Sequence, residues 1–197
     1  MTDELEPEVL GDFFDYTWGP DRLRDQPTFV YLPVHKAPLG PKDWQPFFFE
    51  WPRQRGAVIR HCLRWSAEGS NVYHSPALYH TARPGKENVL GSWLLWVDFD
   101  GNAPTSWTKE LNVPPPTLRI QTSVPSHEHV YWALTDFLTD ISILEDRNRA
   151  LAYTLKADAS GWDGNQILRP PGTVNHRYGK KEGPEGDFPV LVKEWLL

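Results

Sequence analysis

The sequence predicts an α+β domain in which an antiparallel sheet is backed by a helix. Three stretches indicate this architecture. Residues 89–98 (VLGSWLLWVD) form an apolar run that ends in an acid, which is typical of a central strand. Residues 118–134 contain two strand-like stretches joined by the turn VPSHE. Residues 136–157 repeat apolar side chains at helical spacing, with Thr135 or Asp136 as the helix cap.

The remaining segments fit the same class. Short apolar stretches bounded by turn residues predict further strands at residues 28–34, 71–81, 166–169 and 189–196. Between the first two, residues 51–69 predict a helix because Val58, Cys62 and Trp65 recur at helical spacing. The proline-rich connector 112–117 (NVPPPT) fits neither a helix nor a central strand.

Composition excludes several classes of protein. A chain of 197 residues that is 40% hydrophobic can bury a substantial core, which excludes wholesale disorder. No run approaches the roughly 18–20 apolar residues needed to cross a bilayer, and the acidic start has no secretory-signal pattern. Cys62 is the one cysteine, which excludes an internal disulfide framework. We therefore expect a cytoplasmic protein without a membrane partner.

The charge of −6 is unevenly distributed along the chain. Residues 1–25 hold eight acids and two arginines, so the rest is balanced at 18 acidic and 18 basic residues. We expect an acidic arm at 1–25, either loose or at an edge of the fold. Any polyanion would then have to be met by a local basic groove, because the net charge supplies no long-range attraction.

Two aspartates follow the central apolar run, in Val-Asp-Phe-Asp-Gly at 97–101. Side chains two residues apart on a strand point to the same face, so Asp98 and Asp100 would project together. Two carboxylates aimed at one point repel each other unless a cation lies between them, and oxygen ligands suit Mg²⁺ or Mn²⁺. The alternative interpretation is a simple turn, because Asp-Gly after a strand is an ordinary hairpin device.

His129 begins the apolar strand that follows, and it would lie near the carboxylates if the two strands are neighbours. A histidine there can donate a hydrogen bond to a phosphate oxygen. The alternative is a solvated histidine in a turn, which is what we expect of His127.

A third segment, 158–177, carries further acids and then a basic cluster that begins at Arg169. Acids that hold a metal beside bases that hold an anion are what a metal-bound phosphate site requires. The third acid is either Asp158 or Asp163. The alternative interpretation of the whole segment is a polar loop with solvated charges.

In chain order the signals are Asp-Phe-Asp at 98–100, His-Val-Tyr-Trp at 129–132 and LRPPGTVNHRYG at 168–179. This order resembles the archaeo-eukaryotic primase superfamily, specifically the primase–polymerase (PrimPol) domains of phage and plasmid replication proteins. Those domains carry a paired-acid motif, a histidine motif, and a third acid followed by an arginine-proline-glycine-asparagine signature. The resemblance covers about residues 28–180, and RPPGTVN is its most specific part.

The resemblance implies an RRM-like antiparallel palm sheet backed by helices and packed on a smaller N-terminal α/β unit. With the arm at 1–25, the catalytic domain would span 26–197, divided into an N-terminal unit at 26–90 and a palm unit at 91–197. The implied function is template-directed nucleotidyl transfer. Such a DNA primase or polymerase would use NTPs or dNTPs and two Mg²⁺ or Mn²⁺ ions to make or extend primers on single-stranded DNA. A helicase domain or other replication proteins would be its partners.

The resemblance also assigns roles to individual residues. The metal-binding and catalytic acids would be Asp98, Asp100 and Asp163. Asp163 is preferred to Asp158 because an apolar residue precedes it and a strand follows closely. The nucleotide-binding residues would be His129, Arg169, Asn175 and Arg177. There are two departures: His127 replaces the serine that usually lies two residues before the histidine, and Arg177 replaces the usual lysine.

Two other functions fit parts of the sequence. His127, His129 and Tyr131 resemble the histidine pair and tyrosine nucleophile of an HUH-type replication nickase, although Glu128 separates the histidines and the tyrosine lies on the same strand. A non-catalytic replication-initiator module that only binds nucleic acid is the other. Aromatic and arginine residues between Trp51 and Trp65 are suited to stacking bases, or equally to a helix with a solvated arginine face, and are not assigned to the site.

Overall fold

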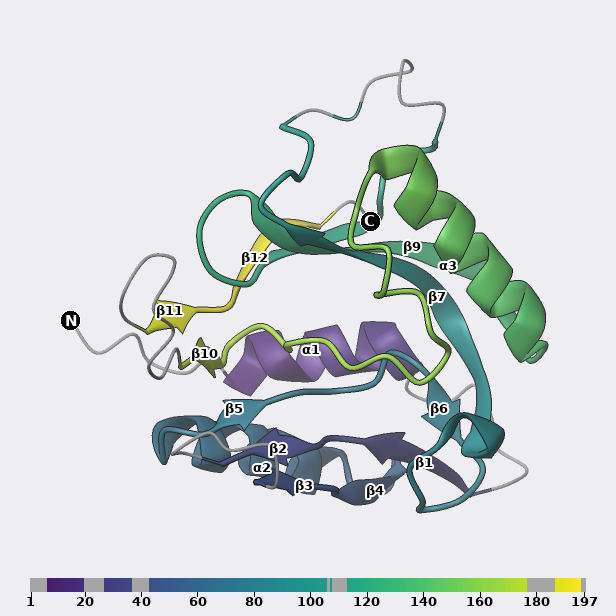
Figure 1. Cartoon of the computed structure of the whole chain (residues 1–197). Coiled ribbons are helices and arrows are strands. Elements are labelled where there is room, and N and C mark those ends of the chain that lie inside the picture. Colours follow the sequence, from purple (N-terminus) through teal and green to yellow (C-terminus); the bar gives the residue numbers. More distant parts are fainter. Residues whose placement is uncertain are drawn as a thin grey trace.

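Strand β7 (Val89–Asp100) connects the two halves of the fold, and Figure 1 shows it as a long curved strand. The computed structural model describes residues 7–19, 27–36, 43–105, 107, 113–176 and 187–195. The start of β7 pairs with β6 (Leu78–Tyr79), whereas residues 92–100 pair with β9 (His127–Leu138). At the junction Gly91 has φ +153°, and a Cβ there would lie 2.3 Å from the carbonyl oxygen of Leu138. Only glycine fits this position.

Because β7 is shared, the main sheet is continuous, with seven strands in the order β12-β8-β9-β7-β6-β1-β4 and every pair antiparallel. Its other strands are β1 (Thr28–Tyr31), β4 (Phe48–Trp51), β8 (Leu118–Gln121) and β12 (Leu191–Trp195). A small sheet has the order β3-β2-β5, with β2 (Val34–His35), β3 (Trp44–Gln45) and β5 (Asn71–Val72). The strands β10 (Val174–Asn175) and β11 (Phe188–Pro189) form a separate pair.

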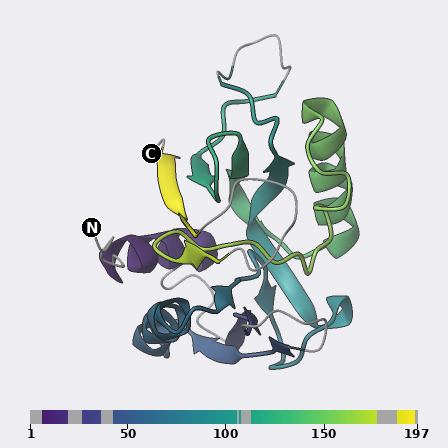
Figure 2. The same ribbon diagram turned by 60° about the vertical axis from the view of Figure 1, so that its left-hand side comes forward.

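In the described part of the chain, three α-helices pack on these sheets: α1 (Pro7–Trp18), α2 (Arg55–Ala67) and α3 (Ile141–Leu155). A short 3₁₀ helix, η1 (Lys86–Asn88), precedes β7. Figure 2 shows α1 and α3 on opposite sides of β7. On the α3 side, Val97 and Phe99 pack with Ala152 and Leu155. On the α1 side lies the larger core cluster, which contains Leu94, Trp96, Tyr131 and the apolar face of α1. The predicted α+β class with an antiparallel sheet is confirmed.

The expectation of a loose or edge arm at 1–25 is wrong for residues 7–18, which form α1. Figure 1 shows this helix between the β7–β9 part of the sheet and the β1–β4 part. Leu10, Phe13 and Phe14 have no exposed surface, because they share one helical face. Acidic residues lie between these apolar residues in sequence. The high negative charge of the segment therefore suggested an exposed arm, although the apolar residues have the spacing of an amphipathic helix. Asp15 accepts a bidentate hydrogen bond from Arg55 of α2 (2.8 and 2.7 Å).

The helix predicted at 136–157 begins later than expected, at Ile141. Asp140 is its N-cap and accepts hydrogen bonds from the backbone N–H of Ser142 and Ile143 (3.0 and 3.2 Å). The preceding residues continue β9 as far as Leu138, which pairs with Ser92 of β7 after a register shift. Elsewhere the strand predicted at 166–169 is reduced to one bridge between Leu168 and His74, and the one predicted at 71–81 is divided into β5 and β6. The unit boundary at 90/91 stays a prediction.

Among the described residues, the three helices are too short or too polar to cross a membrane.

His74 lies fully buried in an aromatic cage formed by α1. Its ring centroid is 5.0 Å from that of Phe13, 5.9 Å from Phe14 and 6.1 Å from Trp18. Burial lowers the pKa of His74 to about 3, because the charged imidazolium would lose its hydration. The ring is therefore neutral in the folded protein.

This burial predicts a pH-dependent stability. In the unfolded chain His74 has an ordinary pKa of about 6.5, so the unfolded state binds its proton first as the pH falls. We expect the free energy of unfolding, measured with urea, to fall as the pH decreases from about 7 to about 5, by at most ~1.4 kcal/mol per pH unit for one histidine. His74→Leu makes this slope shallower, whereas His80→Asn, at an exposed position, leaves it unchanged. An unchanged slope in His74→Leu contradicts the assignment.

Candidate nucleotide-binding and metal site

A cavity of about 550 Å³ opens where β7 ends and β9 begins. Both halves of the fold contribute to its wall. The N-terminal half supplies His35, Asn71 and Tyr73, and the other half supplies Asp98, Asp100, Thr122, Ser123, His127, His129, Ile167, Leu168, Arg169, Asn175 and His176. The cavity therefore gathers Asp98, Asp100, His129, Arg169 and Asn175, five of the residues that the sequence singled out.

Strand register brings the two aspartates opposite the two histidines. In the β7–β9 pair Asp98 is the direct partner of His129, and Asp100 is the partner of His127. The Nε2 atom of His129 lies 3.5 Å from Oδ1 of Asp98, and Nδ1 of His127 lies 3.7 Å from Oδ1 of Asp100. The expected adjacency of these strands is confirmed. His127, expected to be a solvated turn histidine, lies on β9 and lines the cavity.

His129 is held as a neutral hydrogen-bond donor. Its Nδ1 accepts a hydrogen bond from the backbone N–H of Arg169 (3.3 Å), so the ring proton lies on Nε2, facing Asp98. Burial, with the nearby His74 and Arg169, lowers the pKa of His129 well below its usual range. The ring can therefore donate one hydrogen bond into the cavity without carrying a positive charge.

Asp98 is placed where its negative charge is poorly compensated. Burial, together with the charges of Asp100 and Asp158, raises its pKa to about 7, against the opposing effect of Arg169. A carboxylate in such surroundings is stabilised by a bound cation.

The oxygen donors here fit Mg²⁺ or Mn²⁺, which bind through one or two carboxylates together with water and substrate phosphates. Within the described ranges, no group of three or more acidic, histidine or cysteine side chains is close enough to hold a metal by itself. The paired carboxylates of Asp98 and Asp100 thus supply part of a coordination shell that a phosphate would complete.

The two candidates for the third acid occupy different surroundings. The backbone N–H of Asp158 donates to the carbonyl oxygen of Asp98 (2.8 Å), and the charge of Asp158 acts on Asp98. The Asp158 carboxylate accepts hydrogen bonds from the backbone and hydroxyl of Ser160 (2.9 and 2.8 Å). Asp163, the preferred residue, is not among the charges that act on Asp98, and neither acid lines the cavity.

Arg169 is fixed by two residues that the sequence analysis did not identify. Its guanidinium donates to Oδ1 of Asn71 and to the hydroxyl of Tyr73, both at 2.7 Å, and lies 4.5 Å above the Tyr73 ring. The same Oδ1 of Asn71 accepts a hydrogen bond from the backbone N–H of His176 (2.9 Å). Both partners lie in the segment predicted as a strand at 71–81, where side chains two residues apart share a face. That pattern alone gave no reason to place them at the site.

The rest of the RPPGTVN segment closes one wall of the cavity. Asn175 donates from its amide nitrogen to the carbonyl oxygen of Thr122 (2.9 Å), which joins this segment to the β8–β9 turn. His176 is buried between Asp187 and the carbonyl of Ser66 (2.9 and 3.0 Å). Arg177, the last predicted nucleotide ligand, lies outside the described residues.

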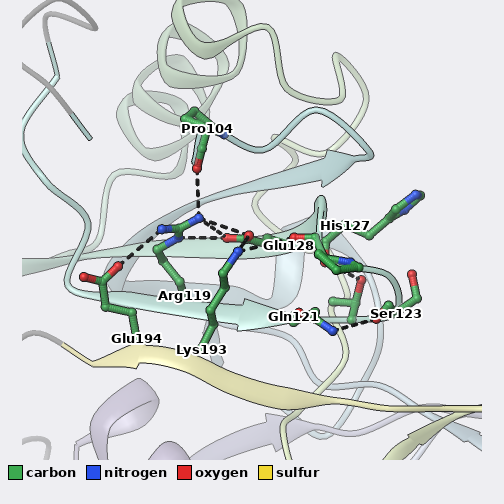
Figure 3. Close-up of polar contacts among 10 residues, drawn as sticks. Pro104, Arg119, Gln121, Ser123, His127, Glu128, Lys193 and Glu194 are labelled. Carbon is green, nitrogen blue, oxygen red and sulfur yellow. Dashed lines mark hydrogen bonds and ion pairs between the residues drawn. The ribbon is translucent and has the colours of Figure 1, made fainter. Parts of the chain in front are cut away.

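A buried ion cluster supports the site from the opposite face of the sheet (Figure 3). Glu128 lies between the two histidines in sequence, so it points to the other face, where it has no exposed surface. Arg119 of β8 donates to both of its oxygens (2.8 and 3.0 Å) and to Glu194 of β12 (3.3 Å). Arg119 also donates to the carbonyl of Pro104 (2.9 Å), and Lys193 donates to Glu128. The cluster fastens β8, β9 and β12 together and so fixes the strand that carries His127 and His129.

Comparisons with known proteins identify the fold. No protein-family model and no curated protein matches the sequence. Among solved structures, the catalytic domain of primase RepB′ in complex with initiator DNA matches with a TM-score of 0.63 at 20% identity, covering 98% of this chain and 86% of that one. The chain has the fold of an archaeo-eukaryotic primase domain. The AEP domain of the cyanophage S-2L primase–polymerase matches with a TM-score of 0.61 at 12% identity, covering 84% and 80%.

A further primase RepB′ structure matches with a TM-score of 0.61 at 20% identity. That match covers 96% of this chain and 56% of that one, so the chain spans little more than half of it. The resemblance of the sequence to primase–polymerase domains is thus confirmed at the level of the fold.

The other sequence candidates lie in the core or are engaged by partners within the structure. Tyr131, the nucleophile of the nickase alternative, is fully buried and packs with Phe13 in the core, where it cannot reach a substrate. Trp51 is also buried, with its indole N–H donating to the carbonyl of Gly19 (2.8 Å). Arg55 pairs with Asp15, and Arg64 with Glu68 (2.8 Å). Within the mixture of arginine and aromatic residues between 51 and 65, structural partners are thus present for Trp51, Arg55 and Arg64.

The ion cluster behind the site predicts a large loss of stability when it is broken. We expect Glu128→Ala to lower the free energy of unfolding by about 3–5 kcal/mol, because it leaves Arg119 charged and buried without its main partner. Urea unfolding measures this. Glu68→Ala, which breaks an exposed pair, is the control and changes the stability by at most ~1 kcal/mol. Equal effects of the two substitutions contradict the structural role of the cluster.

The uncompensated charge of Asp98 predicts the opposite effect. In a chelator, at a pH above the Asp98 pKa of about 7, we expect Asp98→Asn to raise the melting temperature by a few degrees, where ~1 kcal/mol corresponds to about 2–4 °C. Mn²⁺ then raises the melting temperature of the unsubstituted protein but not of Asp98→Asn. Asp146→Asn, at an exposed acid on α3, is the control. If Mn²⁺ does not change the melting temperature of the unsubstituted protein, no metal binds at this site.

Proposed function

We propose that the protein is a template-directed nucleotidyltransferase of the primase–polymerase type, which makes or extends primers on single-stranded DNA. One observation carries the proposal: within a primase fold, the paired carboxylates of Asp98 and Asp100 lie opposite His129 at the mouth of a cavity whose other wall holds Arg169. Carboxylates for a divalent ion next to donors for an anion match the requirements of phosphoryl transfer.

Each residue has a distinct task in this reaction. A 3′-hydroxyl attacks the α-phosphorus of the nucleoside triphosphate, the bond to the β-phosphate breaks, and pyrophosphate leaves. Asp98 and Asp100 would hold divalent ions, which lower the barrier to attack and stabilise the leaving group. His129 would donate its Nε2 proton to a phosphate oxygen, and Arg169 would neutralise charge on the triphosphate. Neutral His129 would thus contribute a hydrogen bond to the triphosphate, whereas Arg169 would contribute a positive charge.

The backbone bond between Asp158 and Asp98 supports Asp158 as the third acid, in competition with Asp163. Movement of the Asp158 carboxylate away from Ser160 would bring it toward an ion held by Asp98. The substrates would be NTPs or dNTPs with a single-stranded DNA template, and Mg²⁺ or Mn²⁺ would be required. One RepB′ structure contains initiator DNA, which supports a DNA substrate for this chain as well.

A primer-extension assay with labelled nucleotides tests the proposal. We expect metal-dependent extension by the unsubstituted chain and none by Asp98→Asn. Asp158→Asn lowers the rate by roughly 100-fold because it weakens the metal site, whereas Asp163→Asn stays within a few-fold of the unsubstituted protein.

Melting temperatures of all variants control for folding. Extension by Asp98→Asn at the normal rate refutes the reaction. If Asp163→Asn lowers the extension rate more than Asp158→Asn does, Asp163 is the third acid. A chain that binds nucleotide without metal and never extends a primer is instead the non-catalytic module.

A further inference from the structure

The small sheet β3-β2-β5 turns one face toward the cavity, and that face continues beyond the cavity wall. His35 pairs directly with Asn71 on one side and with Trp44 on the other. Directly opposed residues project to the same face of a sheet. His35 and Asn71 line the cavity, so Trp44 lies on the same face, one strand further out and on the edge strand β3.

The side chains on this face form a continuous row of ring contacts, in which His35 and Trp44 are stacked and Trp44 and Tyr73 are tilted by 44°. The rings of His35 and Trp44 are parallel, with centroids 4.5 Å apart and an interplanar angle of 2°. Trp44 also lies 5.1 Å from Tyr73, and the guanidinium of Arg169 lies 4.5 Å above the Tyr73 ring. This row of contacts therefore runs from the arginine that would hold phosphate to the surface of the molecule.

Trp44 differs from the other tryptophans by its exposure. It is 40% exposed, and in the described part of the chain it is the one tryptophan among the exposed large apolar side chains. The others, Ile143, Tyr153 and Leu191, lie on α3 and β12 and do not line the cavity. A flat ring, pre-oriented by a stacked neighbour and left open to solvent, can accept another flat ring at little cost in side-chain entropy.

Resting on the proposed function, we propose that Trp44 is a stacking platform for an unpaired base of single-stranded DNA next to the nucleotide cavity. A base has an apolar face that suits an aromatic ring whatever its sequence. The cavity that holds Asp98 and Arg169 is the place of the nucleotide, and Trp44 lies outside its lining, where a strand leading to it would pass.

The test compares binding of two single-stranded oligonucleotides by fluorescence anisotropy: labelled oligodeoxythymidine, and the same backbone with abasic sugars. We expect Trp44→Leu to weaken binding of oligodeoxythymidine by about tenfold or more, and Trp44→Phe to retain most of the affinity. On the abasic strand Trp44→Leu and the unsubstituted protein bind equally. Tyr153→Leu removes an exposed aromatic side chain from α3, outside the cavity lining, and serves as the matched control with unchanged affinity.

Three results would overturn the platform: undetectable binding of oligodeoxythymidine, unchanged binding by Trp44→Leu, or an equal loss on both strands. Calorimetric titration of dNTP supplies a second arm. If Trp44→Leu loses affinity for dNTP but not for DNA, the ring serves the incoming nucleotide and the proposal is wrong. Melting temperatures and Trp44→Phe separate loss of stacking from misfolding.

Binding does not depend on turnover, so the two proposals fail separately. Base-dependent binding through Trp44 in a chain that never extends a primer keeps the platform and refutes the polymerase. Extension with unchanged DNA affinity in Trp44→Leu refutes the platform alone.

Discussion

The candidate site depends above all on the register of β7 against β9. This pairing sets Asp98 opposite His129 and Asp100 opposite His127. A slip of one residue in β9 would turn His127 and His129 away from the two aspartates, to the face covered by α3 where Val97, Phe99 and Val130 now pack. Contacts on both faces of the sheet stabilise this register. The core around Tyr131 holds one face, and the buried pair of Arg119 and Glu128 holds the other. The buried ion pair of Arg119 and Glu128 therefore helps to position the aspartates of the candidate site, although it does not line the cavity itself.

In the candidate site the negative charge of the acids is not fully compensated, and the guanidinium of Arg169 is already hydrogen-bonded to other residues. The pKa of Asp98 is raised because burial and two neighbouring acids act in the same direction. Arg169 does not neutralise it fully, since its guanidinium is held by Asn71 and Tyr73. Natural proteins retain such unfavourable electrostatic interactions at sites where function needs them. A divalent cation together with a polyphosphate would satisfy both halves of the site at once.

Sequence reasoning predicted the parts of this site that lie on long, strongly patterned elements. The apolar run before Asp98 and the strand beginning near His129 were enough to predict two neighbouring strands, and the RPPGTVN segment predicted the opposite wall. It did not predict Asn71, Tyr73 or Trp44, because β5 and β3 are two residues long and too short to show a period. Net charge misled the interpretation of α1, where acids alternate with core residues. The start of α3 was misplaced because residues 135–138 fit a helical pattern but continue β9 to Leu138, which pairs with Ser92 of β7.

The continuity of β7 through Gly91 has a consequence for how substrates are admitted. His35, Asn71 and Tyr73 come from one half of the fold, and Asp98 and His129 come from the other, yet one unbroken strand links the halves. A hinge between them would have to break the bridge between His74 and Leu168 and the hydrogen bonds that Arg169 donates to Asn71 and Tyr73. Opening and closing like a clamshell is therefore not available to this molecule. For the proposed reaction, selection among substrates would then depend on rotamer changes and loop adjustments around a rigid frame.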